Sequence, residues 1–154
     1  MKPTDLIELL IRLEGRISRA PYWIGWLIIL AGEIALRLVF GIPFIPAPAD
    51  AFAVRSSSFL IDVALLYPSI VVMVKRLHDR DHSGWVIGWL IVPSVVLMLT
   101  NLLGMSGDPE HAGVVESLLV IATGVIWLAF MIELGFRPGT PGENQYGPDP
   151  LGRA

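Results

Sequence analysis

The sequence predicts an all-α protein that crosses a membrane as a bundle of four helices. Apolar residues make up 54% of the chain and charged residues only 16%, against roughly a quarter charged in soluble domains. The apolar residues gather in four runs that meet or nearly meet the roughly 20 residues that a membrane helix needs. Because the runs are unbroken, they exclude the alternating pattern of a membrane β-barrel. The predicted spans are 21–41, 57–75, 84–103 and 114–135.

The positions of the basic residues predict on which side of the membrane each loop lies. Nine Lys and Arg residues fall in the N-terminal stretch, the second loop and the C-terminal tail, whereas the first loop has only Arg55 and the third has none. By the positive-inside rule, both termini and the loop 76–81 are expected in the cytoplasm. An interfacial belt of tryptophans at the start of two runs supports the same orientation. These tryptophans are Trp23, Trp26, Trp85 and Trp89.

The segments outside the four runs complete a single predicted domain, residues 1–154. Charges spaced by three and four residues over 5–14 predict a short helix lying in the membrane interface. The tail 136–154 is rich in proline and glycine, which predicts turns rather than a helix. The chain has no cysteine and a net charge of -3, so we expect no thiolate metal site, no cofactor and no nucleic-acid partner.

Besides Lys75 and Glu133 at the cytoplasmic ends, four charged residues fall inside the predicted spans. Glu33 and Arg37 are four residues apart and share one helix face. Asp62 and Glu116 lie at a similar depth in the outward half of their own runs. Such residues are costly in lipid and usually face the bundle interior in pairs, so we expect a cluster of Glu33, Arg37, Asp62 and Glu116. Its role is either a proton or substrate site or a structural ion pair.

The second loop holds the densest polar chemistry of the chain. His78 and His82 have the i, i+4 spacing that zinc sites use, with Asp79 beside them. A zincin glutamate, a nucleophile elbow and a phosphate loop are all missing from the sequence. We therefore expect no metal site and no catalytic residue, and favour a hydrogen-bonded network. Ser83 is expected to cap the third run.

Three motifs of this chain resemble a known family. Residues 15–23 read Gly-Arg-Ile-Ser-Arg-Ala-Pro-Tyr-Trp, residues 76–79 read Arg-Leu-His-Asp before Ser-Gly-Trp at 83–85, and residues 142–150 include Asn-Gln-Tyr-Gly-Pro-Asp-Pro. In this order they are similar to the bacterial inner-membrane family called domain of unknown function 805. Pro21 departs from that family's usual acidic residue, and His82 falls in the variable part of the loop.

The resemblance implies a small four-helix inner-membrane protein without an established reaction. Topology places all three motifs on the cytoplasmic face. The composition of the tail is compatible with partial disorder, but we favour an ordered tail that folds back over the loop, with Asp79 accepting from Arg16 or Arg19. A cap of this kind is our candidate binding site. Its expected residues are Arg16, Arg19, Arg76, His78, Asp79, Ser83, Trp85, Asn144, Tyr146 and Asp149.

Three functions are compatible with these features. The first, which we favour, is a non-enzymatic module whose cap binds a lipid headgroup, a small anion or a protein partner. The second is a small oligomeric transporter or channel that uses Glu33, Arg37 and Asp62. The third is a membrane enzyme that uses His78 and Asp79. Membrane lipids are the expected partners, and a protein partner or a second copy of the chain remain open alternatives.

Overall fold

The computed structural model describes residues 3–46, 50–105 and 113–153, with side chains from residue 6 onward. In chain order, its helices are α1 (Pro3–Ile11), α2 (Arg19–Phe40), α3 (Phe52–Asp79), the 3-10 turn η1 (Gly84–Ile87), α4 (Gly88–Leu102) and α5 (Val114–Gly135). Four segments, with η1 and α4 taken together, are long and apolar enough to cross a membrane. The predicted fold class is confirmed.

The second span is longer than the sequence predicts. Instead of 57–75, α3 runs from Phe52 to Asp79, so the loop that follows it is only 80–83 rather than 76–81. At its start, the hydroxyls of Ser56 and Ser57 donate to the Ala53 carbonyl oxygen and so satisfy their polar groups within the helix. At its end, the polar residues stay helical because other segments bury them, as described below.

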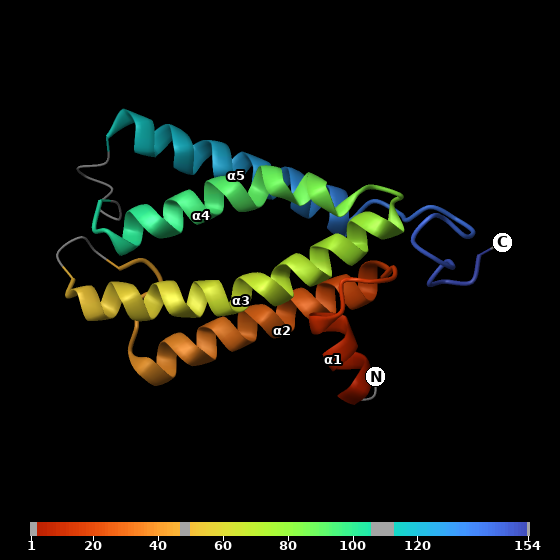
Figure 1. Ribbon diagram of the computed structural model, residues 1–154, viewed down its shortest axis with the longest axis horizontal. Helices are drawn as coiled ribbons and strands as arrows, with labels where there is room; N and C mark the ends of the chain where they lie inside the picture. Colours follow the sequence, from red (N-terminus) through yellow and green to blue (C-terminus); the bar gives the residue numbers. More distant parts are fainter. Residues whose placement is uncertain (1–2, 47–49, 106–112, 154) are drawn as a thin grey trace.

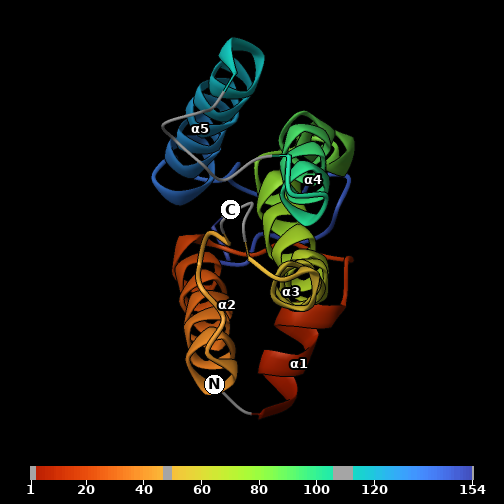
Figure 2. The same ribbon diagram turned by 90° about the vertical axis from the view of Figure 1, so that its left-hand side faces the viewer.

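The four long helices run side by side, with the chain reversing direction between neighbours (Figure 1). At one end lie α1, the loop 80–83 and the C-terminal tail, and at the other end lie the loops after α2 and α4. Figure 2 looks along the bundle and shows α2 beside α3, with α4 on the other side of α3 and next to α5. Both chain termini are therefore on one side of the bundle, as the charge distribution predicts.

Three of the helices end in the same way, with a left-handed residue that reverses the chain. Gly41 after α2 has φ 63°, and Ile42 N–H bonds the Arg37 carbonyl oxygen five residues back at 2.9 Å. Gly104 after α4 has φ 69° and the same pattern. After α3 this position is Asp81, with φ 60°, a residue type that tolerates the left-handed region better than most. These turns place the loops next to one another at each end.

Small residues let the helices approach closely at the tail end of the bundle. A Cβ atom on Gly25 of α2 would lie 2.9 Å from Val72 of α3, and one on Gly84 would lie 3.0 Å from Val74. Close approach at small residues is the usual source of contact between membrane helices, because lipid provides no hydrophobic drive. The Gly84-x-x-x-Gly88 spacing therefore serves packing at Gly84, while Gly88 faces open space.

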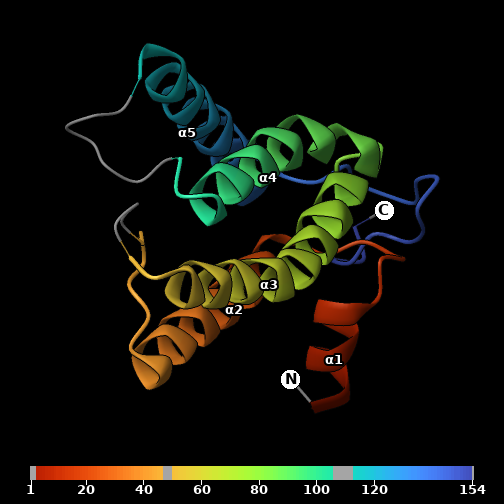
Figure 3. The ribbon, with the colours of Figure 1, turned by 60° about the vertical axis from the view of Figure 1, so that its left-hand side comes forward.

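The amphipathic helix α1 ends earlier than predicted, at Ile11 rather than Glu14. It lies across the bundle at the tail end, beside α2 and α3 (Figure 3). Leu9 is buried in the core, and the Glu8 carbonyl oxygen accepts a hydrogen bond from Lys75. Ile7 and Ile11 stay exposed, so α1 packs on the bundle and also presents an apolar side, as the predicted interfacial helix would.

Candidate functional site

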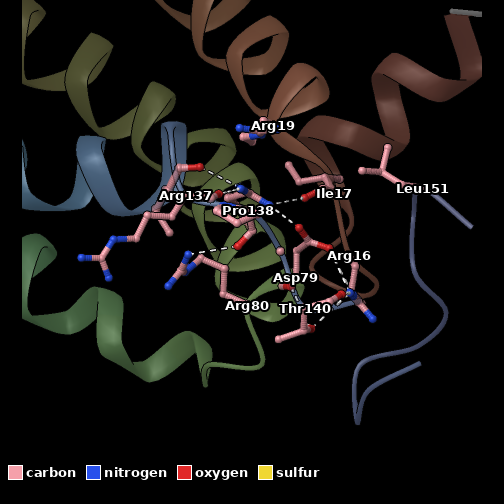
Figure 4. Close-up of polar contacts among 12 residues, drawn as sticks. Arg16, Ile17, Arg19, Asp79, Arg80, Arg137, Pro138, Thr140 and Leu151 are labelled. Atoms are coloured by element: carbon pink, nitrogen blue, oxygen red, sulfur yellow. Dashed lines mark hydrogen bonds and ion pairs between the residues drawn. The ribbon is translucent and has the colours of Figure 1, made fainter. Parts of the chain in front are cut away.

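The buried carboxylate of Asp79, in the last turn of α3, lies at the centre of the end of the bundle on which the C-terminal tail packs. One carboxylate oxygen, Oδ1, accepts from Arg16 Nε at 3.3 Å and Nη2 at 3.2 Å, and the other accepts from Arg76. The Asp79 backbone oxygen accepts from Thr140 N at 2.9 Å (Figure 4). Asp79 is 1% exposed. The predictions that the tail folds over this loop and that Asp79 accepts from Arg16 are confirmed.

We call this assembly the polar cap. It comprises residues 15–19, the end of α3 with the loop 80–83, and the tail 136–153. Two arginines hold its three segments together, and both are buried.

Arg76 connects the end of α3 to the stretch before α2 and to the segment around the end of α5. Its guanidinium donates to the carbonyl oxygens of Leu134 at 2.7 Å and Ile17 at 3.4 Å, and to that of Arg137. The residue is 0% exposed. A buried cation needs both a counter-charge and partners for its remaining N–H groups, and Asp79 together with three carbonyls supplies them. Arg76 therefore binds the protein itself.

Arg16 performs the same task for the tail. Besides Asp79, its guanidinium reaches the carbonyl oxygens of Thr140 at 2.7 Å, Gly142 at 2.8 Å and Gly147 at 3.1 Å. The Arg16 side chain is 1% exposed. Because so many of its N–H groups are bonded within the polar cap, Arg16 shapes the turn of the tail.

The terminal motif of the tail closes over His78. The rings of Tyr146 and His78 are stacked, with centroids 3.8 Å apart and an angle of 4° between planes. Asn144 donates from Nδ2 to the His78 carbonyl oxygen at 2.9 Å, while its Oδ1 accepts from Tyr146 N at 2.9 Å. His78 Nδ1 faces the Gly15 carbonyl oxygen at 3.2 Å. His78 is thus sandwiched between tail and N-terminal stretch.

Asp149 fastens the last turn of the tail. Its carboxylate accepts from Arg153 Nε at 2.8 Å and from Leu151 N at 2.9 Å. These two hydrogen bonds hold the pKa of Asp149 at about 2, below its ordinary value. The carboxylate therefore remains charged throughout the physiological range, and the turn stays closed. Gly142 N–H completes the turn by donating to the Arg153 carbonyl oxygen at 3.1 Å.

Three of the expected site residues lie at the edge of the polar cap. Arg19 does not contact Asp79; it donates to the Phe136 carbonyl oxygen at 3.2 Å and is exposed. Ser83 caps η1 as predicted, since its hydroxyl accepts from Trp85 N at 3.4 Å. The Trp85 side chain points away from the cap and is 91% exposed. Among the residues that the structure describes, no group of His, Asp and Glu side chains could hold a metal ion.

Sequence reasoning missed several residues that complete the polar cap. Thr140 donates from its hydroxyl and its amide to the Asp79 carbonyl oxygen. Arg80 pairs with Glu133 and donates to the Pro138 carbonyl oxygen at 3.1 Å (Figure 4). Gly139 passes so close to Asp79 that a Cβ atom there would lie well under 3.0 Å from the carboxylate. The proline and glycine density of the tail signals turns, but not these partners.

A second polar cluster lies inside the bundle, toward the other end. Arg37 is 3% exposed. Its guanidinium donates to Glu33 at 3.1 Å and to the Ser58 hydroxyl at 3.0 Å, and it pairs with Asp62. The predicted pairing of Glu33, Arg37 and Asp62 is confirmed.

The prediction that Glu116 is the fourth member of this cluster is wrong. Within the described part of the chain, Glu116 makes no hydrogen bond or ion pair. The reason is the path of α5, which diverges from α2 and α3 toward the end where Glu116 lies (Figure 3). Similar depth in the sequence pattern therefore did not bring the side chains together.

We predict that Asp79→Asn destabilises the protein by about 3 kcal/mol, because two buried guanidiniums lose their counter-charge. Thermal unfolding in detergent, followed by circular dichroism, measures this loss. The matched control is Asp81→Asn, which changes an exposed carboxylate whose side chain contacts Gln145 and keeps a residue suited to the left-handed turn. Equal melting temperatures for the two variants would contradict a central role for Asp79.

We also predict that Gly139→Ala releases the tail from the bundle, since the new methyl group and the Asp79 carboxylate cannot occupy the same space. Limited proteolysis of the tail should become several-fold faster. Gly32→Ala is the control, because a Cβ atom at Gly32 meets open space. If both variants are cleaved at the wild-type rate, the close approach of Gly139 to Asp79 is not what holds the tail.

The comparisons with known proteins identify the family of this chain. The family model described as "Protein of unknown function (DUF805)" matches residues 10–148. The chain is 32% identical over 143 residues to the uncharacterized protein YiiR of Escherichia coli strain K12, covering 91% of this chain and 86% of the relative. The YiiR protein of Escherichia coli O157:H7 matches to the same extent. No solved structure matches the chain significantly. The chain is a multi-pass membrane protein that belongs to the DUF805 family, whose function is unknown.

Proposed function

We propose that the protein is a non-enzymatic module of a bacterial inner membrane whose polar cap faces the cytoplasm and binds an anionic phospholipid headgroup. The orientation is supported by nine Lys and Arg residues on the cap side of the four spans. Trp85 and Trp89, both highly exposed, sit just below the cap where an aromatic belt is expected. The relatives in Escherichia coli support the compartment.

The site that carries this proposal is the start of α2. Ser18 precedes the helix without a side-chain cap, and no acidic residue lies in the first turn. Arg19 and Ala20 are exposed. The first amides of a helix point outward, and the helix dipole places partial positive charge there, so such a start attracts phosphate groups.

Arg19 adds a full positive charge to this helix start. Its guanidinium makes one hydrogen bond in the described structure, to the Phe136 carbonyl oxygen, which leaves most of its donors available. Trp23 and Phe136 lie in edge-to-face contact beside it, with centroids 5.6 Å apart, and Phe136 is exposed. An exposed arginine and exposed aromatic surface at the membrane interface suit a headgroup with its glycerol backbone.

The buried and exposed arginines of the cap therefore have different roles. Arg16 and Arg76 hold the cap together, whereas the exposed Arg19 at the uncapped start of α2 is the single observation that carries the proposal. The enzyme alternative receives less support, because the His78 ring is covered by Tyr146 and its Nδ1 faces a carbonyl oxygen. The transporter alternative is supported by the buried pairing of Arg37 with Glu33 and Asp62.

We predict that the purified protein carries phosphatidylglycerol that Arg19→Gln loses. Near an anionic membrane surface each arginine contributes about 1 kcal/mol, so the retained lipid should fall about fivefold in native mass spectra. Arg12→Gln is the charge-matched control, since Arg12 is exposed and pairs with Glu8 within one helical turn. Retention of the same lipid by Arg19→Gln sinks the headgroup proposal and leaves a protein partner as the explanation for the cap.

The proposed orientation has its own test, because a chain without cysteine accepts single-cysteine labels cleanly. We expect Ile45→Cys, in the exposed loop after α2, to react with an impermeant maleimide added to spheroplasts. Glu143→Cys, in the tail, should react only after the membrane is opened or inverted. The opposite pattern of labelling would place the polar cap outside the cytoplasm.

A further inference from the structure

A cavity of about 230 Å³ lies between α2, α3, α4 and α5, within the part of the bundle that crosses the membrane. Its walls combine aromatic rings with one acidic side chain: Tyr22, Trp26, Trp127 and Phe130, with Glu33. Its lining includes neither Arg19 nor Trp23, although Tyr22 belongs to the first turn of α2. Its size is slightly below that of drug-sized ligand sites, which begin at about 300 Å³.

Glu33 brings negative charge to this cavity. Arg37 Nε donates to its Oε1 at 3.1 Å, and Oε2 has no partner among the residues that the structure describes. The other donors of Arg37 are directed to Asp62, Ser58 and the Pro43 carbonyl oxygen. Two carboxyl groups, Glu33 and Asp62, share the one guanidinium of Arg37, so ionisation of both gives the cluster a net negative charge. In a low-dielectric setting such a charge attracts a cation strongly.

The aromatic walls favour the same kind of ligand. The rings of Trp26 and Trp127 lie with centroids 6.0 Å apart and are tilted by 57°, so they present faces at two orientations. Tyr22 is 4% exposed, and its hydroxyl makes no hydrogen bond within the described residues. Faces of Trp and Tyr rings attract cations within about 6 Å.

We propose that this cavity binds a small monovalent organic cation with apolar substituents, such as a quaternary ammonium compound, with Glu33 as its counter-ion. A strongly hydrated ion would lose its water shell among the tryptophans without compensation. An organic cation with apolar groups pays little for leaving water and gains from both the carboxylate and the rings. This binding site is independent of the headgroup site, since the two share no residue.

The test uses the full chain in nanodiscs of zwitterionic phosphatidylcholine, with benzyltrimethylammonium as the probe. Isothermal titration calorimetry should show saturable binding with one site per chain. Glu33→Gln keeps the hydrogen bond to Arg37 but removes the charge. The affinity of this variant for the probe should be about tenfold lower than that of the wild type. Glu116→Gln, which changes a carboxylate outside the cavity lining and the cluster, should bind like the wild type.

A second variant and a neutral ligand keep the result decisive. Trp127→Ala leaves the Glu33–Arg37–Asp62 cluster intact and should weaken binding about tenfold. Neopentylbenzene, the uncharged isostere of the probe, should not compete. The proposal is overturned if the wild type shows no saturable binding, if the well-folded Glu33→Gln variant binds as tightly as the wild type, or if the neutral isostere competes equally. Should Glu33→Gln fail to fold, unchanged affinity of Trp127→Ala overturns it.

Discussion

The carboxylate of Asp79 is the constraint on which the arrangement of this protein depends. It lies at the end of α3, buried between the guanidiniums of Arg16 and Arg76. Arg16 precedes the first span, and most of the carbonyls that the two arginines reach lie in the last turn of the last span or after it. A single buried charge thus fixes segments from both ends of the chain against the middle. The helices alone, packed in lipid without hydrophobic drive, would not specify that relation.

The charge balance of the polar cap explains why the tail is ordered despite its composition. Two guanidiniums face one carboxylate, so the remaining N–H groups need neutral acceptors, and backbone carbonyls of the tail supply them. A regular helix uses its own carbonyls, whereas a chain rich in proline and glycine leaves them free. Because the tail is irregular, its carbonyl oxygens are free to accept hydrogen bonds from the two arginines. Buried ion pairs of this kind add little net stability but penalise wrong arrangements strongly.

The other half of the molecule follows a different rule. Around Arg37 the carboxylates outnumber the cations, and the nearby cavity is walled by aromatic rings. In the polar cap the buried Arg80 Nε has no hydrogen-bond partner among the described residues, and in this cluster Glu33 Oε2 has none. Buried polar groups left partly satisfied in a membrane point to function more often than to stability. The excess of carboxylates over cations and the adjoining aromatic cavity distinguish this part of the protein from the polar cap.

The sequence by itself determined three features: the four spans, the position of both termini on one side of the bundle, and the i, i+4 pairing of Glu33 with Arg37. Each of these depends on local composition or helical period. It also pointed to Asp79 and Arg16 through motif order. Only the tertiary structure decided which arginine meets Asp79, that Gly139 must lack a side chain, and that Glu116 is remote from the cluster. Those outcomes depend on distances between segments far apart in the sequence, such as Arg16 and Asp79, which are 63 residues apart, and on the divergence of α5. A one-dimensional pattern gives the depth of a residue but not the direction in which its helix leans.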